Sequence, residues 1–215
     1  MAEQREQVAH HFVDAGQQHE AASLGMWVFL ATEIMLFGGL FLGYTVYRMA
    51  YPEMFHEMSQ HLNFILGTAN TFILITSSLT MAMAVHSVRE DHKKKLIIFL
   101  LLTIFLGTTF LGIKAVEYYE EYKHNLIPLP GWEFKEAPGL PGSGRLFMAL
   151  YFTMTALHAF HLLIGIGLML VMTGLSLRGN VSVRRPLPIE ISGMYWHLVD
   201  VIWVFLYPLL YLVGR

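Results

Sequence analysis

Residues 96–119 read LIIFLLLTIFLGTTFLGIKAVEYY, and only Lys114 and Glu117 carry charge in this stretch. A helix needs about 20 mostly apolar residues to cross roughly 30 Å of hydrocarbon. Because water is absent there, the backbone must satisfy its own hydrogen bonds, which favours a helix. The stretch therefore predicts a transmembrane helix that carries two charged residues near its C-terminal end.

Four further stretches have the same character, at about residues 24–47, 62–87, 146–177 and 194–213. Each ends at charged residues or at Pro and Gly. None shows the apolar–polar alternation typical of the strands of a membrane β-barrel. The sequence predicts an all-α integral membrane protein, a bundle of five transmembrane helices.

The composition agrees with a membrane location. Of the 215 residues, 55% are hydrophobic and 14% charged, whereas a soluble domain carries about 25% charged residues. The net charge is −2 and no long basic run is present, so nucleic acid is not an expected partner. The chain has no cysteine, which excludes disulfides, iron–sulfur clusters, thiolate zinc sites and the mixed Cys/His copper centre of a redox subunit.

The regions outside the spans suggest an orientation. Residues 1–23 are polar and lack the pattern of a signal peptide, so we expect a cytoplasmic N-terminal segment followed by a membrane domain at 24–215. Lys and Arg are more numerous on the side of the N-terminus, above all at 89–95, which places the C-terminus in the periplasm. We expect a short polar turn around Pro52, and a Pro- and Gly-rich loop at 120–145 with fixed turns but little regular structure.

Glu33 is the most costly residue of the first span. It lies roughly 14 Å into that span, near the middle of the bilayer, and no cation lies one helical turn away. An ionisable residue at this depth costs several kcal/mol on most scales, about 3 or more, and needs a reason. Two hypotheses remain open: a proton-active or lipid-contacting carboxyl, or a structural carboxyl bonded to a partner helix.

Other polar residues fall within the remaining spans. Lys114 and Glu117 share a helix face at i, i+3, which favours an ion pair that anchors the helix at the membrane interface. Asn70 makes the second span partly polar, which is typical of contacts between helices. The glycines of the first and fourth spans also favour close helix approach; they are Gly38, Gly39, Gly43, Gly165 and Gly167.

Two pairs contain histidine, His158 with His161 and His197 with Asp200, each at i, i+3. Such pairs on facing helices could ligate a metal or a haem iron. They could equally hydrogen-bond between helices. A pair lacks the closed set of four ligands of a strong metal motif, so the spacing alone favours the second interpretation.

The last span, YWHLVDVIWVFLYPLLYL at 195–212, resembles the terminal helix of cytochrome c oxidase subunit III. A Tyr-Trp-His run followed by Val-Asp-Val is the hallmark of that family. Motifs on the other spans are similar to it in the same order. The matching residues include Glu33, Asn70, Glu117, His158, His161, Gly165, Glu190, Trp196, His197 and Asp200. The larger family members have seven spans, so this chain resembles the short, five-helix bacterial form.

The resemblance implies an accessory subunit of an aa3-type cytochrome c oxidase in the bacterial inner membrane. Such a subunit has no catalytic residue and binds no haem, copper or other metal, which belong to its partner subunits. It packs against subunit I, belongs with subunit II, binds phospholipid in its helix cleft and supports proton uptake during oxygen reduction. The complex can also join a larger respiratory supercomplex. Glu33 would face subunit I or the lipid, and the remaining intramembrane polar residues would be structural.

Three alternatives stay open. The chain could be subunit III of a quinol oxidase. It could be a haem b membrane anchor that uses His158 or His161 together with His197 or His86. It could also be a proton or ion carrier that uses Glu33, Lys114 and Asp200, although the inverted repeats and broken helices of transporters are not evident.

Overall fold

The computed structural model describes residues 12–123, 143–178 and 186–212. Its elements are α1 (Ala15–Ala50), α2 (Pro52–Gln60), α3 (Phe64–Arg89), α4 (Lys93–Lys123), α5 (Ser143–Leu177), α6 (Leu187–Tyr207) and the π-helical turn η1 (Pro208–Leu212). The prediction of five apolar membrane-spanning helices is confirmed, and these ranges contain no strand. Most of the loop expected at 120–145 lies outside the described residues.

Local sequence sets several helix ends. The Asp14 side chain caps α1 by accepting a hydrogen bond from the backbone N–H of Gln17 at 2.7 Å. The Asn63 side chain caps α3 in the same way through Leu66 N. These side chains satisfy backbone donors that have no partner within the helix. The turn between α3 and α4 contains Asp91 at φ 58°, a left-handed conformation that Asp tolerates better than most residues.

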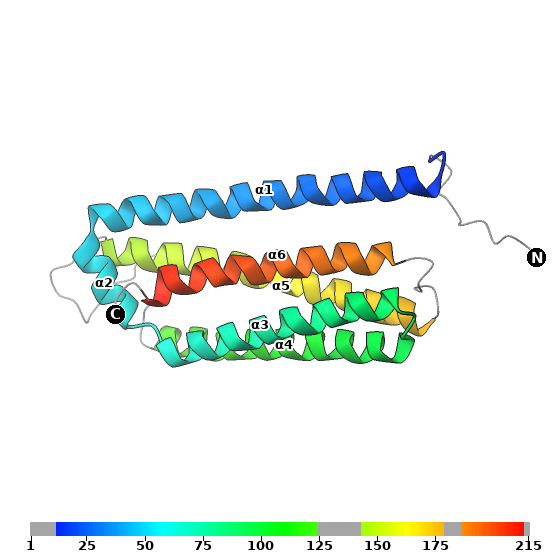
Figure 1. Ribbon diagram of the computed structural model, residues 1–215. Coiled ribbons are helices and arrows are strands. Elements are labelled where there is room, and N and C mark those ends of the chain that lie inside the picture. The colour runs from blue at the N-terminus through cyan, green and yellow to red at the C-terminus, as the bar shows by residue number, and fades with distance from the viewer. Residues whose placement is uncertain (1–11, 124–142, 179–185, 213–215) are drawn as a thin grey trace, which may run out of the picture.

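The segment expected as a polar turn after the first span is instead the helix α2. Pro52 occupies its first turn, where a missing N–H costs nothing. Met54, Phe55 and Met58 are buried, at the i, i+1, i+4 spacing of one helix face. The apolar side of this short helix packs against the start of α5 and against η1, which closes one end of the bundle. We call this end, where η1 also lies, the α2 end (Figure 1).

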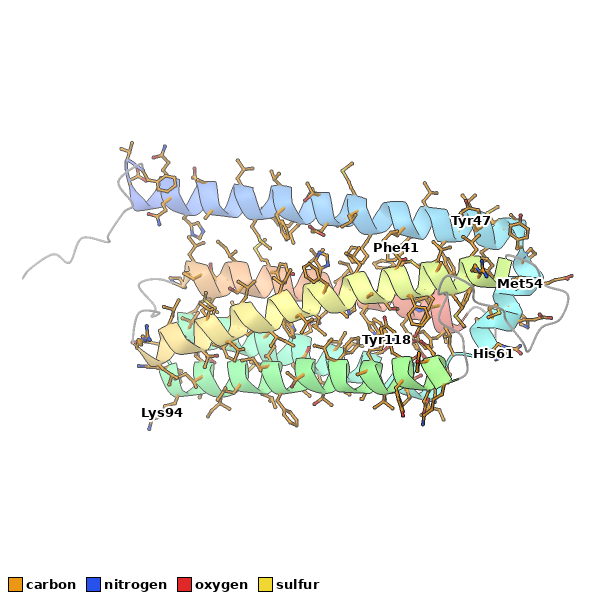
Figure 2. All side chains as sticks on the ribbon, turned by 180° about the vertical axis from the view of Figure 1, so that it is seen from behind. Phe41, Tyr47, Met54, His61, Lys94 and Tyr118 are labelled. Carbon is orange, nitrogen blue, oxygen red and sulfur yellow. The ribbon has the colours of Figure 1, made fainter. Side chains whose placement is uncertain are left out.

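Helices α3, α4, α5 and α6 form a closed group in which each helix packs against two others of the four. Helix α1 lies outside this group, against α5 and α6 (Figure 1). Phe41 points from α1 toward its neighbours in the view from behind (Figure 2), and its ring centroid lies 6.5 Å from that of Phe205. The opposite side of α1 is apolar and exposed, with Met35 and Met49 each 77% exposed.

The centre of the four-helix group is filled by the indole of Trp196, which is fully buried. Glycines from two helices allow its close approach. A Cβ added at Gly107 of α4 would lie 2.8 Å from the indole, and one at Gly165 of α5 would lie 3.0 Å from it. Close helix approach is therefore confirmed for Gly165. The other predicted glycines, Gly38, Gly39, Gly43 and Gly167, have no such neighbour within 4 Å among the described residues.

Replacing Gly107 with alanine is expected to lower the free energy of unfolding by about 1–3 kcal/mol, because overpacking displaces a rigid buried ring. Gly112→Ala on the same helix is the matched control, since a Cβ there meets nothing within 4 Å. The control should be neutral or slightly stabilising. Thermal unfolding of both variants in detergent measures the difference. Equal stability of the two variants would show that the glycine at 107 is not needed for packing.

The last transmembrane helix changes its winding at Pro208. Proline has no N–H for the i→i−4 bond and crowds the preceding turn. The α-helix ends at Tyr207 and the chain continues as the π-helical turn η1. The Tyr44 hydroxyl donates a 2.6 Å hydrogen bond to the carbonyl of Leu209, so α1 satisfies one carbonyl of this irregular turn.

Candidate functional site

The middle of the membrane domain contains a pair formed by Glu33 of α1 and His161 of α5. Glu33 Oε2 lies 2.9 Å from His161 Nε2. The side chains are 14% and 9% exposed, respectively. Of the two hypotheses for Glu33, the structure shows the bond to a partner helix. A hydrogen-bonded carboxyl can also exchange a proton, so this bond is compatible with the proton-active hypothesis.

The hydrogen bonds of His161 restrict where the protons of this pair can lie. His161 Nδ1 lies 2.8 Å from the carbonyl of Leu157, and a carbonyl can only accept, so Nδ1 must carry a proton. Nε2 then either accepts a hydrogen bond from a protonated Glu33 or donates one to the Glu33 carboxylate. In both cases one proton is shared between Nε2 and the carboxyl, and the pair is neutral overall. Neutrality lowers the cost of placing it in a bilayer.

Aromatic side chains surround the pair. The ring of Phe37 meets that of His161 edge to face at 5.4 Å. The Tyr195 hydroxyl donates to the carbonyl of His161 at 2.9 Å, and the Tyr195 ring stacks on Phe29 at 5.9 Å. These contacts join α1, α5 and α6 around one polar pair. The Phe37 contact packs against the imidazole, and the Tyr195 hydrogen bond holds the backbone of His161.

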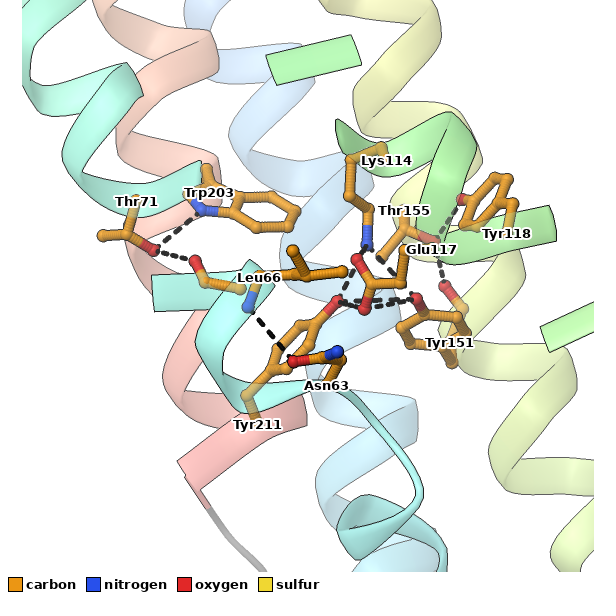
Figure 3. A network of polar contacts seen from close by, with 11 residues as sticks. Asn63, Leu66, Thr71, Lys114, Glu117, Tyr118, Tyr151, Thr155, Trp203 and Tyr211 are labelled. Carbon is orange, nitrogen blue, oxygen red and sulfur yellow. Dashed lines mark hydrogen bonds and ion pairs between the residues drawn. The ribbon is translucent and has the colours of Figure 1, made fainter. Parts of the chain in front are cut away.

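A second polar cluster lies inside the bundle toward the α2 end (Figure 3). Lys114 Nζ lies 2.9 Å from Glu117 Oε2, 2.8 Å from the Tyr211 hydroxyl and 3.2 Å from the Tyr151 hydroxyl. Tyr211 also donates to Glu117 Oε1 at 2.6 Å. The ammonium lies 5.3 Å from the ring centroid of Trp203, which adds a cation–π contact.

The predicted ion pair of Lys114 and Glu117 is formed, but not at an exposed interface. The two side chains are 4% and 2% exposed, because Tyr151 of α5 and Tyr211 of η1 cover them. Sequence reasoning missed both tyrosines, since neither is close to the pair along the chain. It also missed Glu121, one turn after Glu117, which is 4% exposed.

Hydrogen bonds connect α3 and α6 at successive turns. The Thr68 and Tyr207 hydroxyls lie 2.6 Å apart. The Trp203 indole donates to Thr71 at 3.1 Å, and the Trp196 indole donates to Ser77 at 3.2 Å. The Ser78 hydroxyl lies 2.8 Å from His197 Nδ1. His197 therefore bonds to a neighbouring helix, as the second interpretation of the histidine pairs expects.

Asp200 does not bond to His197, although the two share a helix face. Its side chain is 5% exposed, and neither carboxyl oxygen has a hydrogen bond to any residue that the structure describes. The Ser78 hydroxyl lies near the carboxyl but outside hydrogen-bonding geometry. Asp200 is thus a buried carboxyl near the middle of the α6 span, without a hydrogen-bond partner among the described residues.

His158 and Asn70 are buried in the group of four helices. The ring of His158 lies between Phe110, at 5.6 Å, and Trp203, at 5.2 Å. Within the described ranges, no hydrogen bond reaches either nitrogen of His158 or the amide of Asn70. His158 thus faces α4 and α6, whereas His161 faces α1.

The histidines do not converge on one site. His158 faces the aromatic core, His161 faces Glu33 and His197 faces Ser78. Among residues 12–123, 143–178 and 186–212, no group of three or more His, Asp or Glu side chains could hold a metal ion. Because the ring of His158 contacts Phe110 and Trp203, a porphyrin would have to displace packed aromatic side chains. This placement does not fit a haem held by His158.

Glu190 and Arg89 form an ion pair at the end of the bundle opposite the α2 end. Arg89 Nε lies 2.8 Å from Glu190 Oε1. The Arg89 side chain is 63% exposed and the Glu190 side chain 21%, so the pair contributes little to stability, about 0–1 kcal/mol. It connects the end of α3 to the start of α6.

Comparison with known proteins gives these features a family. The model of the family described as cytochrome c oxidase subunit III matches residues 6–215. Cytochrome c oxidase subunit 3 of Alkalihalophilus pseudofirmus is 28% identical over 194 residues, which cover 89% of this chain and 86% of that protein. Quinol oxidase subunit 3 of Bacillus subtilis is 31% identical over 200 residues, with the same shares covered.

A third relative joins two subunits in one polypeptide. The protein of Aeropyrum pernix named "Heme-copper oxidase subunit I+III" is 29% identical over 200 residues, which cover 87% of this chain and 22% of that protein. The family match extends over nearly the whole chain and includes all five apolar helices. The chain therefore belongs to the cytochrome c oxidase subunit III family, as a multi-pass membrane subunit of a bacterial haem-copper terminal oxidase.

Proposed function

We propose that this chain is the accessory subunit III of an aa3-type cytochrome c oxidase, without a redox centre and without catalytic activity of its own. It stabilises subunit I, supports proton uptake during the reduction of oxygen to water, and holds phospholipid against its helices. The observation that carries the proposal is the 2.9 Å contact between Glu33 Oε2 and His161 Nε2, near the middle of two membrane-spanning helices.

The proton role follows from the chemistry of this pair. Carboxyl and imidazole groups exchange protons readily, and ionisable residues within membranes commonly belong to proton relays. A proton can move between Glu33 and His161 without changing the net charge of the pair. Both side chains keep some exposure at the boundary between α1 and α5, so a partner subunit or lipid can contact them there.

The exposed apolar side of α1 supports the proposal that this chain packs against subunit I and contacts lipid. This helix packs against two of the other spans, α5 and α6, on one side, and its free side is apolar, with Trp27 62% and Met35 77% exposed. The Aeropyrum relative, whose name joins subunits I and III, supports a partnership with subunit I. The proposal also includes an association with subunit II, a cytoplasmic N-terminus and membership of a larger respiratory supercomplex.

The alternative donor is a quinol. Quinol oxidase subunit 3 of Bacillus subtilis is as similar to this chain as the cytochrome c oxidase relatives are. Oxygen consumption by the purified complex decides between the donors. We expect the complex to consume oxygen with reduced cytochrome c as its sole electron donor, without added quinol. Activity with a quinol and none with cytochrome c would assign the chain to a quinol oxidase.

A further inference from the structure

A groove between α3 and α6 opens on the outside of the bundle near mid-membrane depth. It encloses about 280 Å³. Its walls are largely apolar and include Ile75, Leu79, Val201 and Val204, which are 47–63% exposed. Asp200 lines the same groove, and its two carboxyl oxygens have no hydrogen bond within the described part of the chain.

The position of Asp200 limits what can satisfy it. Asp200 lies near the middle of the α6 span and Ser78 near the middle of the α3 span. A lipid headgroup stays at the membrane surface, roughly 15 Å away, and an acyl chain offers no hydrogen-bond donor. An unpaired polar group in hydrocarbon costs several kcal/mol, about 2–7. An occupant that satisfies Asp200 must therefore bring a hydrogen-bonding group to the centre of the bilayer.

The spacing of the lining residues fits a helix. On α3, the groove residues Thr71, Ile75, Ser78 and Ala82 follow one another at intervals of four, three and four residues. This is the spacing of a seam that packs along a neighbouring helix at a small crossing angle. Small side chains such as Ala82 and Ser78 let a neighbouring backbone approach closely.

On α6, the groove residues continue the pattern with His197, Val201 and Val204, at intervals of four and three residues. Asp200 lies beside this seam. Two adjacent seams on neighbouring helices form a surface on which a third helix can lie. Among the five spans that the structure describes, α1 alone lies outside the four-helix group, and it lies against α5 and α6. The groove is open to a partner from outside the chain.

We propose that this groove receives a transmembrane helix of another oxidase subunit, and that this helix presents a polar side chain that hydrogen-bonds to Asp200 at mid-membrane depth. The inference rests on the proposed function, because it requires a partner subunit. It adds the face of the chain that makes the contact and the chemistry that recognises the partner helix.

Photo-crosslinking in the native membrane tests the occupant. A p-benzoylphenylalanine placed at Ile75 should form a covalent adduct with a transmembrane peptide of a partner oxidase subunit, identified by mass spectrometry of the purified complex. The same group placed at Phe105, which is 64% exposed on α4 and lies outside the groove, is the reference position and should not form this adduct. Adducts with lipid alone at Ile75, in a complex that retains its haem-bearing subunits, would overturn the inference but not the proposed function. Failure to recover any oxidase subunit would count against both.

Substitution of Asp200 tests the chemistry. Asp200→Leu should weaken retention of the chain in the detergent-purified complex by about 3- to 18-fold, the range that corresponds to one hydrogen bond between membrane helices. Asp200→Asn keeps a hydrogen-bonding side chain and should stay within about twofold of the wild type. Thr76→Val is the matched control, because Thr76 is exposed on α3, lies outside the groove and bonds to its own helix. Equal retention of Asp200→Leu and Thr76→Val would contradict the proposed contact.

Discussion

Replacing Lys114 with methionine is expected to lower the free energy of unfolding by about 3–5 kcal/mol, because it leaves the Glu117 carboxylate buried without its cation. The carboxylate is 2% exposed and keeps only the hydroxyls of Tyr151 and Tyr211 as partners among the described side chains. The loss should also loosen η1, since Tyr211 bonds to both charged groups. Unfolding by heat or by a denaturing detergent, followed by circular dichroism, measures the effect.

Two further variants separate the loss of the ion pair from the loss of packing. Lys114→Met combined with Glu117→Gln removes both charges and should recover much of the stability, because no unpaired charge remains. Lys123→Met on the exposed end of α4 removes a cation that lies 4.4 Å from the ring centroid of Tyr119, and should cost about 1 kcal/mol or less. If the double variant is as unstable as Lys114→Met, the buried charge is not the cause.

Replacing Glu33 with glutamine is expected to leave the oxidase assembled but to shorten its lifetime during turnover, on the order of tenfold, or to slow proton uptake to a similar degree. A tenfold change corresponds to about 1.4 kcal/mol in the activation free energy. Glutamine can still donate an N–H to His161 Nε2, so the contact between α1 and α5 persists. It cannot gain or lose a proton, so the shared proton of the pair is lost.

The measurement compares the steady-state rate of oxygen consumption, and the time over which it decays, in wild-type and variant complexes. Glu20→Gln near the start of α1 is the matched control, because Glu20 is exposed. An unchanged rate and lifetime in Glu33→Gln would show that the pair is structural alone. A complex that fails to assemble would show that the carboxyl is needed for folding.

The spans could be predicted from sequence because each apolar stretch must satisfy its backbone internally. The ends of the helices could not be predicted with the same accuracy. The span expected at 96–119 is the centre of α4, which runs from Lys93 to Lys123, because helical hydrogen bonding continues beyond the hydrocarbon. The short helix α2 carried a signal, namely Pro52 in the first turn and the spacing of Met54 and Met58. Its charged residues favoured the interpretation as a turn.

The candidate site was only partly accessible from the sequence. Glu33 and His161 each stood out as a polar residue within an apolar helix, but their pairing depends on how α1 rotates against α5. Apolar side chains cover nearly the whole circumference of these helices, so no polar face indicates the rotation. The same is true of Lys114, whose partner Tyr211 is brought into place by the irregular turn after Pro208. Such contacts are decided by packing rather than by the local pattern.

The central claim is that this chain is an accessory subunit whose haem lies in its partners. A reduced-minus-oxidised spectrum of the tagged chain, purified in mild detergent, tests it most directly. We expect an a-type haem band in the complex that disappears when the chain is stripped from its partners. An o-type band that behaves in the same way would support the accessory role and point to the quinol donor. A b-type band that stays with the isolated chain would mean that its histidines are ligands, and would contradict the account.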